Sequence, residues 1–195
     1  KYVVYKESRP IADLKHMLET SVQAYGDNVA FMQKFHKDEP YKSITYKEAF
    51  ETVNALGTAL INAGLKNKRI AVIGENCYQW ATSYLAVICG TGVVVPLDKE
   101  LGASELGQLI KESQASAVMF TEKYTDIFKE IKENGDSQLE ILIKLNGDKQ
   151  EENVLTWSGL IAEGKKLLEK GDRRFIDAEI DPDAMSELLF TSGTT

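Results

Sequence analysis

Arg69-Ile70-Ala71-Val72-Ile73-Gly74 and Val93-Val94-Val95-Pro96 are two short apolar runs, separated by the mostly apolar segment 78–90. Short apolar runs bounded by glycine or proline are typical of buried strands, and a proline closes a strand because it has no N–H to donate. The segment between them is long enough for a helix, on which Trp80 and Tyr84 share one side. A strand, a buried helix and a second strand form a βαβ unit, whose crossover is right-handed in nearly all proteins. The sequence therefore predicts an α/β fold built on a parallel sheet.

The same alternation of helix and strand continues toward the end of the chain. A polar stretch at 146–153 predicts an exposed excursion, and 172–182 reads as a linker without a clear period. We expect parallel βαβ layers with helices on both faces of the sheet. The further elements predicted are helices at 104–113, 124–132 and 155–169, and strands at 117–121, 140–145 and 186–190.

A different pattern precedes the βαβ region. It predicts a helix over 11–25, a small β-hairpin with strands at 29–36 and 43–45, and a second helix that ends at about residue 63. Thr45 followed by Glu48 is a capping box, which explains these two residues as the start of that second helix without any ligand. The chain is thus expected to divide into 1–65 (leading helix, hairpin and helix), 66–180 (the βαβ region) and 181–195 (a strand and a truncated loop after it).

Composition places the chain among globular proteins and excludes several functions. Of its 195 residues, 43% are hydrophobic and 27% charged, and the net charge of −7 argues against binding to a nucleic-acid backbone. The sequence holds no apolar run of about 18 residues that would span a membrane. Its first residues include several charged side chains and lack the apolar core of a secretory signal. We therefore expect a cytoplasmic protein without a transmembrane segment.

Cysteine and histidine spacing does not indicate a metal or a hydrolytic site. Cys77 and Cys89 fall at opposite ends of one predicted helix, roughly 18 Å apart at about 1.5 Å per residue, which is too far for a disulfide. With His16 and His36 they form no close ligand pair, and neither histidine belongs to a recognised Ser or Cys arrangement. No protein-bound metal and no catalytic residue is predicted within the chain.

Two common nucleotide-binding motifs are also absent. The first strand-to-helix turn, Gly74-Glu75-Asn76-Cys77, holds a single glycine where a dinucleotide fingerprint needs three. No Gly-Lys-Ser/Thr triplet is present for a Walker-type loop.

The last five residues, Thr191-Ser192-Gly193-Thr194-Thr195, follow a predicted buried strand at 186–190. A glycine flanked by hydroxyls suits phosphate binding, because glycine permits a tight turn and each hydroxyl adds a donor. A simple polar turn after a strand accounts for the same composition. The residues alone leave both interpretations open.

Three segments together resemble the adenylate-forming enzymes, the superfamily of acyl-CoA synthetases, luciferases and peptide-synthetase adenylation domains. Residues 183–195 resemble its phosphate-binding signature, 44–50 an early Thr-Tyr-x-Glu element, and 85–98 the element that ends in Val-Pro-Leu-Asp. The departures are Ala49 for leucine, a looser match at 91–92, and Lys99 where proline is common. The resemblance implies that the chain is an incomplete N-terminal part of a large AMP-binding domain.

The resemblance also implies a mechanism. Family members join ATP and a carboxylic acid into an acyl-adenylate with release of pyrophosphate, and acyl-CoA synthetases pass the acyl group to CoA. By this match the ATP phosphate-binding residues are Thr191, Ser192, Gly193, Thr194 and Thr195, with Mg²⁺ balancing the phosphate charge. The cofactors expected for an intact parent are ATP, Mg²⁺ and CoA. No cofactor is expected to stay bound to the 195-residue fragment, because the rest of the family's site would follow Thr195; the fragment is expected to be inactive.

Within the superfamily, Asn76-Cys77-Tyr78-Gln79-Trp80 favours the long-chain fatty-acid ligases, and hence fatty acid metabolism. A peptide-synthetase-type adenylation domain and a non-catalytic α/β scaffold module remain alternatives. The partners implied are a carboxylic acid, ATP and CoA. The sequence indicates neither the length of the acid nor the oligomeric state.

Overall fold

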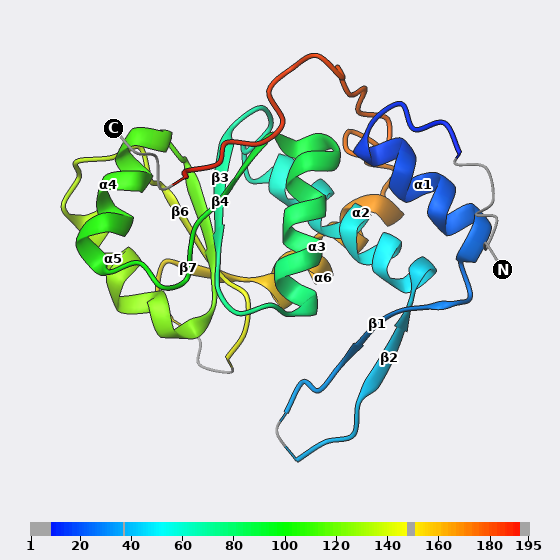
Figure 1. The fold of residues 1–195 in the computed structure, drawn as a ribbon, viewed down its shortest axis with the longest axis horizontal. Helices are drawn as coiled ribbons and strands as arrows, with labels where there is room; N and C mark the ends of the chain where they lie inside the picture. Colours follow the sequence, from blue (N-terminus) through cyan, green and yellow to red (C-terminus); the bar gives the residue numbers. More distant parts are fainter. Residues whose placement is uncertain (1–8, 37, 148–150, 192–195) are drawn as a thin grey trace, which may run out of the picture.

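A computed structural model describes residues 9–36, 38–147 and 151–191. Its centre is a five-stranded sheet in the order β4-β3-β5-β6-β7, in which every neighbouring pair is parallel (Figure 1). Next to the edge strand β4 lies β3, where Ile70 pairs with Val94 on one side and with Ala117 on the other. The prediction of a parallel α/β fold is confirmed. The strands are β3 (Arg69–Ile73), β4 (Val93–Pro96), β5 (Ala117–Phe120), β6 (Ile141–Lys144) and β7 (Val154–Thr156).

Helices cover both faces of the sheet, as predicted. On one face lie α2 (Tyr46–Asn62), α3 (Tyr78–Ala86) and α6 (Trp157–Glu169). On the other lie α4 (Ala103–Ser113) and α5 (Thr125–Glu133), and Figure 1 shows the two groups on opposite sides of the strands. This arrangement follows from the period of a strand, whose successive side chains point to opposite faces and must both be buried in a parallel sheet.

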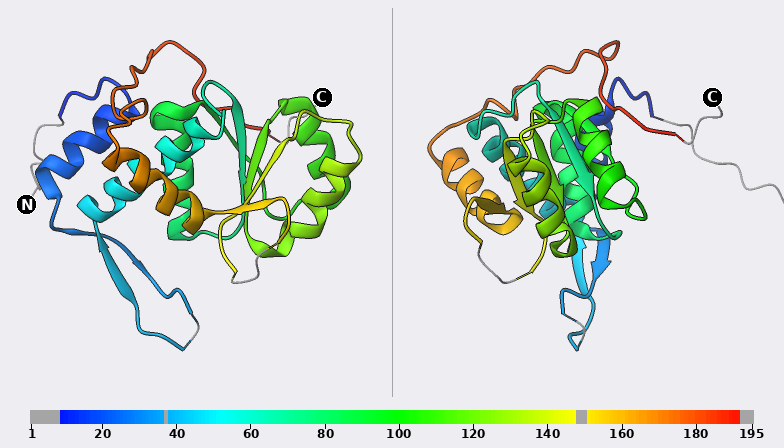
Figure 2. Two further views of the ribbon diagram at one scale, coloured as in Figure 1. Left: turned by 180° about the vertical axis from the view of Figure 1, so that it is seen from behind. Right: turned by 90° about the vertical axis from the view of Figure 1, so that its left-hand side faces the viewer.

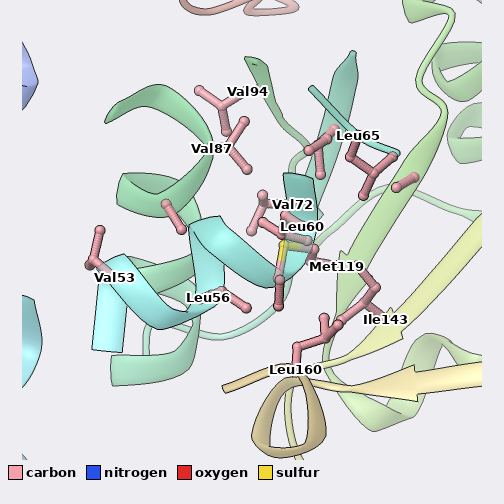
Figure 3. Close-up of a cluster of buried hydrophobic side chains, with 14 of the residues drawn as sticks. Val53, Leu56, Leu60, Leu65, Val72, Val87, Val94, Met119, Ile143 and Leu160 are labelled. Atoms are coloured by element: carbon pink, nitrogen blue, oxygen red, sulfur yellow. The ribbon is translucent and has the colours of Figure 1, made fainter. Parts of the chain in front are cut away.

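The larger of the two cores lies under α2, α3 and α6. Val72 and Val94 from the sheet meet Leu56 and Leu60 from α2, and Leu160 closes the layer from α6 (Figure 3). Four of these five side chains have no exposed surface. Apolar runs without alternation, such as 70–73, are what burial on both faces requires.

The N-terminal part is built from α1 (Leu14–Tyr25) and a hairpin of β1 (Val29–Gln33) and β2 (Lys42–Thr45), which extends away from the sheet (Figure 1). The predicted capping box is present at the start of α2. The Glu48 N–H donates to Thr45 Oγ1 over 3.2 Å, and the Thr45 N–H donates to the Glu48 carboxylate over 2.8 Å.

The helix predicted over 78–90 changes geometry before its end. It is α-helical to Ala86 and continues as a single π-helical stretch, Val87–Thr91, in which the Thr91 hydroxyl donates to the Ala86 carbonyl over 2.8 Å. Gly90 adopts φ +152°, a backbone conformation that favours glycine. A Cβ at Gly90 would also lie 3.2 Å from the Phe175 ring, so the π-helical stretch is shaped by the segment that packs on it.

Two predictions near the edges of the sheet are wrong. The start of the helix predicted over 155–169 is instead the short strand β7, because Val154 to Thr156 pair with β6 through backbone bonds that periodicity does not reveal. The buried strand predicted at 186–190 is an extended segment with one parallel bridge, Val94 to Glu187. Leu189 is 61% exposed, and among the described residues β4 is the one strand that pairs with this segment.

We predict that Gly164→Ala destabilises the fold. A Cβ at Gly164 would lie 1.8 Å from the Ala55 carbonyl oxygen, so that α2 and α6 would have to separate. Overpacking of this kind costs about 3 kcal/mol of unfolding free energy, measurable by urea denaturation. The matched control is Gly107→Ala on α4, where the nearest side-chain atom would be 3.7 Å away and helix propensity should add up to about 1 kcal/mol. Equal stability of the two variants would contradict this packing.

Candidate functional site at the carboxyl edge of the sheet

The direction of the chain reverses between β3 and β5. From β3 the chain crosses to β4 on one side, and from β4 it returns past β3 to β5 on the other. In doubly wound sheets, ligands bind beyond the carboxyl ends of the strands at such a reversal. The residues that follow β3, β5 and β6 therefore form the candidate site.

A charged pair bridges the two strands at the reversal point. Glu75 follows β3 and Lys123 follows β5, and their side chains form an ion pair of 2.6 Å, with Thr121 donating to the second carboxylate oxygen over 3.2 Å. The hydrogen bond from Lys123 lowers the pKa of Glu75, and the same bond raises the pKa of Lys123. Gly74 lets the strand ends approach, because a Cβ there would lie 2.5 Å from the Thr121 methyl group.

A second charged group lies at the end of β6. The side chain of Lys144 is only 1% exposed, and its ammonium lies 3.4 Å from a carboxylate oxygen of Glu122 and 3.4 Å from one of Glu151. Lys129 of α5 forms an ion pair with the other oxygen of Glu151. The hydrogen bond from Lys129 is the main cause that lowers the pKa of Glu151. Two cations and two carboxylates thus join β5, α5 and β6 to the segment that leads into β7.

Sequence reasoning did not single out Glu75, Lys123 or Lys144. A usable signal was present, because each charged residue ends an apolar run that predicts a strand or follows it within three residues. In a parallel sheet those positions share one edge.

The segment Asn76–Trp80 begins α3 and faces the hairpin. The Cys77 thiol caps the helix by accepting the Trp80 N–H over 3.4 Å, and Gln33 of β1 accepts the Tyr78 N–H over 2.5 Å. Burial raises the pKa of the Cys77 thiol. A cleft of about 380 Å³ lies beside this junction and is lined by Phe31, Met32, Gln33, Asn76, Cys77, Tyr78, Trp80 and Ala81.

Of the five predicted phosphate-binding residues, only Thr191 is described, and it is exposed. Ser192, Gly193, Thr194 and Thr195 lie outside the described residues. The segment before Thr191 runs parallel to β4: Val94 donates to the Ser186 carbonyl over 3.0 Å, and Leu188 donates to the Val94 carbonyl over 2.9 Å. This direction leads the chain toward the carboxyl edge of the sheet.

The histidines and cysteines considered in the sequence analysis do not form a site in the described part of the chain. His16 accepts the Ala12 N–H at the start of α1, and His36 is exposed near the tip of the hairpin. Cys77 and Cys89 are free thiols, as predicted. Within residues 9–36, 38–147 and 151–191, no group of three His, Cys, Asp or Glu side chains could hold a metal ion. No helix in this same part of the chain has the length and apolar character needed to cross a membrane.

Comparison with known proteins identifies the family. Residues 18–195 match the model of a family described as AMP-binding enzyme. The chain belongs to the AMP-binding enzyme family. The resemblance to adenylate-forming enzymes inferred from three segments is thereby confirmed over nearly the whole chain.

Curated relatives of this AMP-binding chain include long-chain acyl-CoA synthetases. It is 27% identical over 183 residues to long chain acyl-CoA synthetase 4 of Arabidopsis thaliana, a match that covers 90% of the chain and 27% of the relative. It is 26% identical over 186 residues to long-chain-fatty-acid–CoA ligase 5 of Rattus norvegicus, covering 88% and 26%. The chain therefore spans about a quarter of the length of these relatives.

Among solved structures, a long-chain-fatty-acid-CoA ligase (FadD1) from Archaeoglobus fulgidus has the same fold. The TM-score is 0.77 at 18% identity, and the match covers all of this chain and 37% of the ligase. The shared fold is the parallel sheet with helices on both faces that the sequence predicts.

We predict that Glu151→Gln destabilises the chain near neutral pH. The pKa of Glu151 is lowered in the folded state, so its carboxylate adds stability above the ordinary pKa of a glutamate, about 4.3, and this is lost as pH falls through the folded-state pKa. The urea midpoint of the variant should therefore lie below that of the wild type at pH 7 and approach it below about pH 4.

The control for this pH dependence is Glu152→Gln, at a neighbouring exposed position. Its urea midpoint should equal that of the wild type at both pH values. A Glu151→Gln variant with an unchanged midpoint at pH 7 would show that the cluster around Lys144 adds no stability.

Proposed function

We propose that this chain is part of an AMP-forming acyl-CoA synthetase, which activates a carboxylic acid, here a fatty acid, as its adenylate and transfers it to CoA. The observation that carries the proposal is the family match over residues 18–195, which includes the hydroxyl-rich end of the chain. The relatedness to long-chain acyl-CoA synthetases favours a fatty acid. The expected partners are the acid, ATP and CoA, and the expected localisation is cytoplasmic.

In this proposal the hydroxyls and backbone N–H groups of Thr191–Thr195 hold the β- and γ-phosphates of ATP. Phosphate oxygens need several donors at once, and a glycine between hydroxyl residues allows the backbone to turn toward them. The pairing of residues 186–188 with Val94 supports this role, because it sets the direction in which the chain reaches Thr191. Fixed donors stabilise charge that develops on the leaving pyrophosphate without reorganising during the reaction.

Mg²⁺ would enter with the phosphates of ATP and balance their charge. The described residues offer it no cluster of protein ligands. We therefore assign neither metal ligands nor catalytic residues within the described part of the chain.

The domain limits are part of the proposal. We keep 1–65, 66–180 and 181–195 as segments of one AMP-binding domain rather than as separate domains. Support comes from the larger core, where Leu56 and Leu60 from the first segment pack against Val72 and Met119 from the second.

The proposal is tested on the longest polypeptide that the gene encodes. We expect ATP-dependent release of pyrophosphate with at least one fatty acid, and formation of its CoA ester when CoA is added. Pyrophosphate release only with amino acids would instead support a peptide-synthetase-type adenylation domain. No release with any acid would support a non-catalytic scaffold.

The predicted loop is tested in the same assay. Ser192→Ala combined with Thr194→Ala removes two hydroxyl donors and should lower kcat/KM for ATP by about 100-fold, which is typical for the loss of fixed donors to a transition-state charge. Ser158→Ala, at an exposed position of α6, is the matched control and should retain wild-type kinetics. If the double variant kept wild-type kinetics, the loop would not be part of the ATP site.

The 195-residue chain alone should bind ATP weakly. Its Thr191–Thr195 segment carries no basic side chain to balance phosphate charge. We expect a Kd in the millimolar range or weaker by calorimetric titration, equivalent to about 4 kcal/mol or less. A micromolar Kd would mean that another part of this chain binds the nucleotide.

A further inference from the structure

One turn of chain after α6 is held by a lysine from the opposite end of the sequence. The ammonium of Lys15, on α1, donates to the carbonyl oxygens of Phe175, Ile176 and Ala178 over 3.2, 2.7 and 2.6 Å. A lysine has three N–H donors, so this single turn can use all of them. Hydrogen bonds from a charged donor are the stronger kind, and here they join segments about 160 residues apart.

The same turn is held from its inner side by an aromatic ring. Phe175 is 1% exposed and belongs to the larger core. Its ring lies against two glycines: a Cβ would be 2.2 Å from the ring at Gly57 in α2, and 3.2 Å from it at Gly90. The Phe175 ring therefore fits only because these two positions are glycines.

This turn is the first part of the linker that connects α6 to residues 186–188, which pair with β4. From Ala178 the chain runs as the orange-to-red trace in Figure 2, and residues 186–188 pair with Val94. Lys66 donates to the Gly90 carbonyl over 2.6 Å and so holds the π-helical stretch against which Phe175 packs. Fixing the start of a short connection limits the positions that its far end can reach.

We propose that Lys15 is a positioning residue for residues 186–191, the segment that leads to the proposed phosphate-binding residues. Its ammonium binds three carbonyls of the turn, and the Phe175 ring anchors the same turn in the larger core. Together these contacts fix where the linker begins. The effect on ATP rests on the proposed function, whereas the effect on the pairing with β4 does not.

The first test is hydrogen exchange on the 195-residue chain. Lys15→Met keeps much of the side-chain length but removes the three donors, and the Leu188 amide, which donates to Val94, should then exchange at least tenfold faster. Amides of β3 and β5 should keep their protection, which separates local release from general unfolding. Lys15→Arg should restore most of the protection, because a guanidinium can also donate to several carbonyls.

Lys165→Met is the matched control, since Lys165 is exposed on α6. It should leave the Leu188 amide unchanged. Unchanged exchange at Leu188 in Lys15→Met would overturn the proposal, as would equal acceleration in β3 and β5. Should Lys15→Met not fold, Lys15→Gln is measured by the same criteria.

The second test uses pyrophosphate release by the longest encoded polypeptide. Lys15→Met should raise KM for ATP several-fold, leave KM for the acid unchanged, and be rescued by Lys15→Arg. Unaltered KM for ATP would overturn the link to the phosphate loop. If the wild type releases no pyrophosphate, the proposed function fails, while the exchange at Leu188 still decides whether Lys15 positions the segment.

Discussion

The structure depends on β3 pairing on both sides. Ile70 is bonded in register to Val94 and to Ala117, and none of these residues has exposed surface. The two strands that pair with β3 extend the sheet in opposite directions: β4 carries the terminal segment on its outer edge, and β5 leads to β6 and β7. Because all these strands are parallel, their following residues meet at one edge, where charged and polar groups can act together.

Two separate sets of contacts fix the surroundings of the candidate site. At the carboxyl edge, Glu75 and Lys123 bridge the reversal point, and buried Lys144 joins β6 to its neighbours. Beside Gly90, in the stretch of chain that precedes β4, the contacts of Lys15 and Phe175 hold the start of the linker. The candidate phosphate loop thus follows a segment that is fixed at both ends by described residues.

The fold was largely predictable because its signals are local. Apolar runs such as 70–73 and 93–95 mark strands that are buried on both faces, and the Thr45–Glu48 capping box fixes a helix start within four residues. Features that depend on distant partners were missed. Val154–Thr156 forms a strand by pairing with β6, and Leu189 is exposed although its segment pairs with β4.

The prediction that Thr191–Thr195 bind phosphate rests on resemblance. Thr191–Thr195 carry a composition that a polar turn shares, and three matched segments were needed to favour phosphate binding. No local signal reveals the role of Lys15, whose partners lie some 160 residues away. By contrast, Glu75 and Lys123 could have been found by asking which charged residues follow each predicted strand.

The most direct test of the account is a crystal structure of the longest encoded polypeptide with ATP bound. We predict that the β- and γ-phosphates lie within hydrogen-bond distance of the hydroxyls and N–H groups of Thr191–Thr195, beyond the carboxyl end of β4. ATP bound with its phosphates elsewhere, and those hydroxyls in contact only with protein, would contradict the account.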